Sequence, residues 1–304
     1  MPRGWLRSSG LIYVGILLVL FGEGAIACSK PATAARATAT PTPSMSSSPS
    51  PSNSPISGAT AKGSTFVIVL ENRSYEQVIN DPYFSQLASQ YAVATNYHAI
   101  THPSAPNYLA LTSGSTWGVQ DDVYHVLPAQ GLGDQLDAAG VSWKVYAESM
   151  TGDCLNSPYP YAVKHNPFAY YGGQCPPNAV PMTNLAGDLT AQMPQLAWLI
   201  PNMCNDGHDC SLATVDSWLG SVVPQIVASP AWQDHGVLLI TFDEDDGSSS
   251  NQVATFVIAP GLKVHSSDVA YDHYSLLATI EDRLGVGRLG AAQNSSPMQD
   301  LVPS

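Results

Sequence analysis

Short apolar segments recur along the chain and limit its fold more than any other feature. They are continuous rather than alternating, and they cover Thr65–Leu70, Val141–Ala147, Leu196–Ile200, Gly236–Phe242 and Ala254–Ala259. Continuous apolar runs of this length are typical of strands that are buried on both faces. Helix-like segments lie between them at Tyr75–Tyr91, Gly133–Ala139, Val215–Ala228 and Tyr274–Leu284. We therefore expect an α/β fold with a mostly parallel central sheet and helices on both faces.

The N-terminus has the features of a signal peptide. Arg3 and Arg7 precede the apolar run Leu11–Gly22, which is shorter than the ~20 residues that a membrane-spanning helix needs. The small-residue motif at Ala25–Ala27 follows and suits a cleavage site. We therefore expect residues 1–27 to be a signal peptide and the protein to be exported.

Cys28 directly follows that motif, so the stretch also resembles a bacterial lipoprotein box. The next residues are mainly Ala, Thr, Pro and Ser, a composition that forms a spacer rather than a core. Residues 28–63 are therefore expected to be a tether, with membrane contact through a lipid anchor at Cys28, or with simple secretion as the alternative. Residues 64–304 then form the catalytic domain.

The other cysteines form an even set that suits an oxidising compartment. We favour the local pairing, Cys154 with Cys175 and Cys204 with Cys210, because short loops close most readily. The Tyr-, Pro- and Gly-rich segment Asn156–Asn178 would then be a long loop held by its cysteines. The alternative is a structural zinc site, although the spacing lacks paired C-x-x-C units.

Charge restricts the partners of the folded part. From Glu71 onward the chain has six Lys and Arg residues against 23 acidic residues, a balance of about −17. This argues against nucleic-acid binding through a basic surface. If the substrate is an anion, a bound metal ion is the natural group to hold it.

Polar side chains follow the ends of several expected strands. Glu71 and Asn72 follow the first strand, the segment "PNMCNDGHDC" follows the third, and "DEDDG" follows the fourth. Ligands of open parallel sheets gather at the carboxyl ends of the strands. Carboxylates, an amide and a few histidines suit a divalent cation such as Zn, Ca, Mn or Mg. We therefore expect a cation site at this edge.

The acidic run Asp243–Gly247 does not fit an EF-hand. Gly247 stands where the fifth ligand should be, and Ala254 stands where the closing Glu should be. The second pair of carboxylates, Asp245 and Asp246, is expected to lie in a solvated turn.

The segments "VLENRSYEQVI", "HPSAPNYLALTSGST", "IPNMCNDGHDC", "TFDEDDG" and "YDHYSLLATIEDRLG" carry a family resemblance. Together they resemble the bacterial phosphoesterase family of acid phosphatases and phospholipases C, a branch of the alkaline phosphatase superfamily. The resemblance runs in the family's order from Phe66 to Leu284. It implies an alkaline-phosphatase-like fold and hydrolysis of a phosphoric ester.

The resemblance also implies site residues. Glu71 and Asn72 match the first metal ligands of the acid phosphatases, and Asp243 and Glu244 match the acidic pair that closes that site, although the family often has two Asp there. Ser104 falls at the nucleophile position of related phosphodiesterases, in a T/S-x-P-N pattern that includes Asn107 and opens a helix. A helix N-terminus offers free N–H groups to a phosphate, and a metal ion would activate the hydroxyl.

Other residues match less completely. Asp206 and His208 resemble the loop that supplies a second metal ligand or a leaving-group acid, with a disulfide-pinned surface turn as the alternative. His273 matches a histidine that contacts metal or phosphate. His102 flanks the nucleophile and has either a structural or a functional role. No motif assigns a role to the other histidines: His98, His125, His165, His235 and His265.

These features predict an exported, metal-dependent phosphoric-ester hydrolase, an acid-type phosphomonoesterase that uses Ser104 on a small-molecule or lipid phosphoester. The alternatives are a phospholipase C or other phosphodiesterase and, outside enzymes, a calcium-binding surface lipoprotein. A serine-hydrolase elbow at Gly114–Gly118 has Thr116 at its centre and no strand leading into it. A sulfatase would need a C-x-P-x-R-like motif, and the chain has none.

Overall fold

The computed structural model describes residues 63–247 and 250–302. The expected signal peptide at residues 1–27, Cys28, and the tether up to residue 62 lie outside the described residues.

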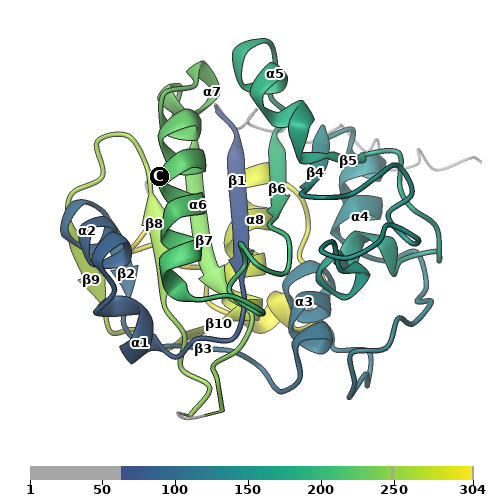
Figure 1. The fold of residues 1–304 in the computed structure, drawn as a ribbon, viewed down its shortest axis with the longest axis horizontal. Coiled ribbons are helices and arrows are strands. Elements are labelled where there is room, and N and C mark those ends of the chain that lie inside the picture. Colours follow the sequence, from purple (N-terminus) through teal and green to yellow (C-terminus); the bar gives the residue numbers. More distant parts are fainter. Residues whose placement is uncertain (1–62, 248–249, 303–304) are drawn as a thin grey trace, which may run out of the picture. The chain divides into compact units, whose positions relative to one another are not determined.

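Eight strands form one sheet in the order β5-β4-β6-β1-β7-β8-β2-β9 (Figure 1). The first five strands in this order run parallel to one another. Two further short strands, β3 and β10, pair separately. The bounds of the strands are β1 Thr65–Leu70, β2 Ala92–Ala94, β3 Tyr97–His98, β4 Trp143–Ala147, β5 Ala179–Pro181, β6 Leu196–Ile200, β7 Val237–Phe242, β8 Thr255–Ile258, β9 His265–Ser267 and β10 Tyr271–Asp272.

The centre of the sheet is buried on both faces, which explains its continuous apolar pattern. Every residue of β1, β6 and β7 is buried. The parallel register aligns Thr65 with Leu196 on one side and Leu70 with Phe242 on the other. The predicted α/β fold with a mostly parallel sheet is confirmed.

The edge of the sheet formed by β8, β2 and β9 is not purely parallel. The last apolar run forms β8, which is antiparallel to β7, and β2 is antiparallel to β8. The short strands β2 and β9 were missed by the sequence pattern because three residues are too few to show a period.

Helices cover both faces of the sheet. In Figure 1, α6 lies in front of the central strands and α8 lies behind them. The helix α2 packs against α6, and α3 packs against α8. Their bounds are α1 Tyr75–Ile79, α2 Pro82–Gln90, α3 Ser104–Ser113, α4 Leu132–Ala139, α5 Leu185–Thr190, α6 Leu212–Val227, α7 Pro230–Gln233 and α8 His273–Leu284, with 3-10 turns η1 Val163–His165, η2 Pro167–Ala169, η3 Met182–Asn184 and η4 Gly290–Asn294.

The predicted helix Tyr75–Tyr91 is wrong as a single element. It divides into α1 and α2, with Asp81 before α2 and Pro82 as its first residue. Proline lacks a backbone N–H and fits only the first turn of a helix, so the chain begins a new helix there.

Both predicted disulfides are confirmed. Cys154 is bonded to Cys175, and Cys204 is bonded to Cys210. The alternative zinc site therefore has no free thiolates among these four residues. The first bridge encloses η1 and η2, so the expected loop contains two short 3-10 turns. In the part of the chain that the structure describes, no helix is long and apolar enough to cross a membrane.

Candidate active site

Ser104 is the first residue of α3, and its side chain is buried at the carboxyl edge of the sheet. Pro103 precedes it in an extended conformation, and the helix ends at Gly114 in the left-handed region. The first N–H groups of a helix have no partner within the helix, and its dipole favours negative charge there. The hydroxyl therefore lies at the end of a helix whose dipole favours negative charge.

Three side chains from two neighbouring strands surround the Ser104 hydroxyl. Its Oγ lies 3.0 Å from Glu71 Oε2, 3.2 Å from Glu244 Oε1 and 3.5 Å from Asn72 Oδ1. Glu71 and Asn72 directly follow β1, and Asp243 and Glu244 directly follow β7. Because β1 and β7 are parallel and paired, their carboxyl ends meet at one edge. The structure thus brings the expected strand-end residues together with Ser104.

Asn72 links the two strand ends. Its backbone N–H donates to Asp243 Oδ1 at 3.2 Å, and its side-chain Nδ2 donates to Glu244 Oε1 at 3.0 Å. Its φ angle of 39° lies in the left-handed region, which asparagine tolerates better than most residues. This conformation directs both amide groups of one residue toward the acidic pair.

The carboxylates of this cluster are buried close to one another, which disfavours their charged forms. Burial raises the pKa of Glu71, and the charges of Asp243 and Asp206 raise it further. Burial, followed by the charge of Glu244, raises the pKa of Asp243. Asp243 Oδ2 is buried and has no hydrogen-bond partner within the described residues. Carboxylate and amide oxygens in this number fit a divalent cation.

The loop between Cys204 and Cys210 borders the cluster. Asp206 is buried, and its backbone oxygen accepts from the Glu71 N–H at 2.9 Å. The His208 ring has Nδ1 2.7 Å from Asp209 Oδ1 and Nε2 3.2 Å from Lys164 Nζ. Asp206 therefore contacts the cluster through Glu71 and His165, whereas His208 is exposed and contacts Asp209 and Lys164.

His165 is a site residue that the sequence pattern missed. Its Nε2 lies 3.1 Å from Glu71 Oε1, and its Nδ1 lies 3.0 Å from Asp206 Oδ2. The ring stacks on Tyr108, whose hydroxyl donates to the same Glu71 oxygen at 2.5 Å. Burial lowers the pKa of His165. It lies in η1, and its position inside the loop closed by Cys154 and Cys175 was the one available hint.

His102 also contacts the site. Its Nδ1 lies 2.5 Å from Glu244 Oε2, and its side chain is 48% exposed. It therefore connects a carboxylate beside Ser104 with the solvent. Its Nε2 lies 3.5 Å from Asp245 Oδ1.

The solvated turn predicted for the second acidic pair is half correct. Asp246 is exposed, and its Oδ2 accepts from Gln77 Nε2 at 2.6 Å. Asp245 is buried, and the solvated setting predicted for it is wrong. Its oxygens accept from the backbone N–H groups of Gly247 at 2.7 Å and Asn251 at 3.0 Å. The carboxylate therefore lies inside the turn and stabilises it.

His273 and Asn107 make hydrogen bonds to the backbone of residues next to the site. His273 is buried, with Nε2 2.6 Å from the Asp243 carbonyl oxygen and Nδ1 2.9 Å from the Tyr97 hydroxyl. Burial lowers its pKa to about 4, so the ring is neutral. Asn107 Oδ1 accepts from the Thr101 N–H at 3.1 Å, and its Nδ2 donates to the Pro103 carbonyl at 3.1 Å. Both side chains use their polar atoms to hold backbone near Ser104.

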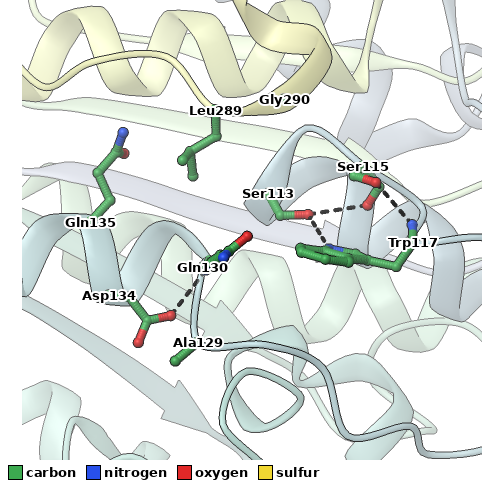
Figure 2. A pocket seen from close by; sticks show the side chains of 10 residues that line it. Ser113, Ser115, Trp117, Ala129, Gln130, Asp134, Gln135, Leu289 and Gly290 are labelled. Carbon is green, nitrogen blue, oxygen red and sulfur yellow. Dashed lines mark hydrogen bonds between the residues drawn. The ribbon is translucent and has the colours of Figure 1, made fainter.

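A cavity of about 480 Å³ lies at the other end of α3 (Figure 2). Trp117 and Leu289 line it, and the indole Nε1 donates to Ser113 Oγ at 2.9 Å. The segment Gly114–Gly118 lies here, directly after a helix rather than between a strand and a helix. The serine-hydrolase elbow is therefore excluded.

Comparisons with known proteins agree with this arrangement. The Phosphoesterase family matches residues 80–287. The chain is 33% identical over 250 residues to a phosphatidylinositol-3-phosphatase of Mycobacterium tuberculosis, covering 77% of this chain and 81% of that protein. It is 30% identical over 281 residues to an acid phosphatase of Aspergillus fumigatus, covering 82% of this chain but 61% of that protein.

Solved structures share the fold at low sequence identity. A protein of the alkaline phosphatase superfamily from Vibrio parahaemolyticus has a TM-score of 0.54 at 13% identity, covering 80% of this chain and 73% of that one. The phosphonate monoester hydrolase of Agrobacterium radiobacter has a TM-score of 0.52 at 12% identity, covering 78% of each chain. The chain therefore belongs to the Phosphoesterase family of acid phosphatases and phospholipases C, with the fold of the alkaline phosphatase superfamily.

Proposed function

We propose that the protein is a phosphomonoesterase in which Ser104 is the nucleophile. One observation carries the proposal: the Ser104 hydroxyl lies at the start of α3 and within 3.5 Å of oxygens from Glu71, Asn72 and Glu244. A nucleophilic hydroxyl needs a proton acceptor, and a phosphoryl group needs donors and positive charge. This edge of the sheet offers carboxylate oxygens as proton acceptors and the N–H groups at the start of α3 as donors, and the proposed cation would supply the positive charge.

The proton of the Ser104 hydroxyl has a defined path. Oγ lies 3.2 Å from Glu244 Oε1, and the other oxygen of that carboxylate lies 2.5 Å from His102 Nδ1. When Oγ bonds to phosphorus, its proton passes to Glu244 and then to His102, which is in contact with solvent. The ester P–O bond breaks, and His208 donates a proton to the leaving oxygen after its Nε2 separates from the Lys164 ammonium. Water then attacks phosphorus, the P–Oγ bond breaks, and a proton of that water returns to Ser104 Oγ as phosphate leaves, while His208 regains its proton from solvent.

The cation of the site would be held by Glu71, Asn72 and Asp243, with Glu244 at their edge. Their donor atoms suit Zn, Ca, Mn or Mg. When bound there, a divalent ion would offset the carboxylate charge and lower the pKa of a neighbouring hydroxyl. His273 acts as a positioning residue, because it holds the Asp243 backbone and its own ring nitrogens are occupied.

The substrate class is a phosphate monoester on a lipid or a small molecule. The mycobacterial relative, which is named as a phosphatidylinositol-3-phosphatase and matches most of this chain, supports this proposal. Activity on phosphatidylinositol 3-phosphate and p-nitrophenyl phosphate, compared with bis-p-nitrophenyl phosphate and phosphatidylcholine, separates a phosphomonoesterase from a phosphodiesterase or phospholipase C.

Rapid quenching with ³²P-labelled substrate, followed by peptide mapping, tests the nucleophile. We expect label on the peptide that contains residues 100–115, specifically on Ser104. Ser104→Ala should lower kcat by at least ~10³-fold, the scale expected when a covalent route is lost. If Ser104 only capped the helix, alanine would cost about 1 kcal/mol of stability and little activity. Label on Ser115, or an active Ser104→Ala enzyme, would overturn the assignment.

Export and anchorage at Cys28 form a separate part of the proposal. The two disulfides suit an oxidising compartment, and Cys28 follows a small-residue motif. The exported protein should partition into detergent, whereas Cys28→Ser should not. Equal behaviour of the two forms would indicate simple secretion.

A further inference from the structure

Lys164 is a positively charged residue beside the acidic cluster. The proposed reaction assigns it no role. Its Nζ lies 3.1 Å from Asp122 Oδ2 and 3.2 Å from His208 Nε2, and its side chain is 17% exposed. Burial lowers the pKa of Lys164, but the charges of Glu71 and Asp122 outweigh this and raise it, so the ammonium stays charged.

Arg73 is a second positively charged residue near the site, and backbone carbonyl oxygens already occupy its guanidinium. The Arg73 guanidinium donates to the carbonyls of Asn72 at 2.8 Å, Gly207 at 2.7 Å and Cys210 at 3.0 Å. It holds the Cys204–Cys210 loop against the end of β1. Lys164 is therefore the better placed of these two side chains to meet an incoming anion.

Asp122 places a carboxylate on the backbone N–H of Ala105, the residue that follows Ser104. Its Oδ1 accepts from the backbone N–H of Ala105 at 2.9 Å, while its Oδ2 contacts Lys164. Ala105 is the second residue of α3, so its N–H has no partner within the helix. The Asp122 carboxylate thus bridges the backbone N–H of Ala105 and the ammonium of Lys164.

Asp122 reaches this position on a long loop. The loop leaves α3 at Ser115 and Trp117 and returns at Ala129 and Gly131, and both of these ends line the cavity of Figure 2. The ten residues of α3 span ~15 Å between that cavity and Ser104. The Asp122 side chain is 35% exposed, so packing does not enclose it.

We propose that the Ala105 N–H and the Lys164 ammonium form the position that binds a non-bridging oxygen of the substrate phosphoryl group, and that the Asp122 carboxylate occupies it until substrate displaces it. This inference rests on the proposed function. A carboxylate and a phosphoryl group present the same kind of anionic oxygen to an N–H group and an ammonium. Both cannot occupy the position together, because their negative charges repel at contact distance.

The proposal predicts that Asp122 weakens phosphate binding. When a site is free for only a fraction of the time, the apparent Kd rises by the inverse of that fraction. Removing the carboxylate should therefore tighten binding, whereas a carboxylate that only stabilised the active helix would have the opposite effect when removed. This difference in sign is the basis of the test.

Calorimetric titration of the exported protein with inorganic phosphate tests the proposal without turnover. Asp122→Asn and Asp122→Ala should each lower the Kd for phosphate by about ten-fold, as expected if the carboxylate occupies the position about 90% of the time. Asp121→Asn is the matched control, because Asp121 is exposed, pairs with His125, and loses the same charge. Its Kd should stay within about two-fold of the original, a factor too small to count as loss of a competing group.

Substitutions of Lys164 provide a second, independent test in the same titration. Lys164→Gln should raise the Kd for phosphate by about ten-fold or more, and Lys164→Arg should restore most of the binding. With Lys164 replaced, the gain from Asp122→Ala should shrink, because the two side chains act on one position. Unchanged or weaker phosphate binding in both Asp122 variants would overturn the proposal, and so would equal tightening in Asp121→Asn.

The same variants distinguish this inference from the proposed function. Normal hydrolysis of p-nitrophenyl phosphate with no tightening in Asp122→Ala would overturn the inference and leave the phosphomonoesterase proposal standing. Tighter phosphate binding in a protein that hydrolyses no phosphomonoester would support the anion position and overturn the function.

Discussion

At the scale of single residues, His165 shows how the site is organised beyond its nucleophile. It lies between Glu71 Oε1 at 3.1 Å and Asp206 Oδ2 at 3.0 Å, so it contacts a carboxylate that also contacts Ser104. We expect His165→Gln to lower kcat by about 10–100-fold, the scale found when a partner that orients a site carboxylate is lost. Steady-state hydrolysis of p-nitrophenyl phosphate measures this, with circular dichroism to confirm folding. The exposed His125→Gln is the control; equal activity in both variants would contradict the role of His165.

At the scale of elements, α8 carries a buried carboxylate that makes stability depend on pH. Glu281 Oε1 accepts from the Leu289 N–H at 2.8 Å, and burial raises its pKa to about 8. Above about pH 4.5 the folded state therefore holds a proton on Glu281 that the unfolded chain has released. The contribution of this proton to the free energy of unfolding is complete at low pH and is lost as pH rises through 8. Glu281→Gln should raise the free energy of unfolding at pH 9 by about 2 kcal/mol and leave it little changed at pH 5. Urea unfolding at both pH values measures this, and the exposed Glu76→Gln should show no such difference.

At the scale of the whole molecule, the proposed cation should couple binding to stability. The folded part has a strongly negative charge balance, and the buried carboxylates of Glu71 and Asp243 repel each other without a positive partner. Chelation should therefore lower Tm by about 5–10 °C, as expected from a loss of about 3 kcal/mol at an ion concentration near 100 times Kd. Differential scanning calorimetry with and without EDTA measures the change. Adding back the ion should restore Tm, and Asp243→Asn should respond much less; an unchanged Tm in the native protein would contradict the cation.

The sequence alone determined the features that depend on neighbours along the chain. Continuous apolar runs predicted the buried strands β1, β6 and β7, because burial on both faces leaves no room for alternation. The polar residues at the strand ends, such as Glu71 and Asp243, could be placed at one edge because parallel strands end together. The local cysteine pairing was also predictable, since short loops close most readily.

Only the tertiary structure decided the contacts between residues that no local pattern relates. His165 approaches Glu71, and Lys164 approaches Asp122 across 42 positions of sequence, because separate loops converge on the start of α3. Asp245 became buried for a similar reason: Asn251 folds back to donate to its carboxylate. A histidine or a carboxylate in a loop has no periodicity that reveals its partner. Its burial and its hydrogen bonds are set by which distant segments the sheet and helices bring beside it.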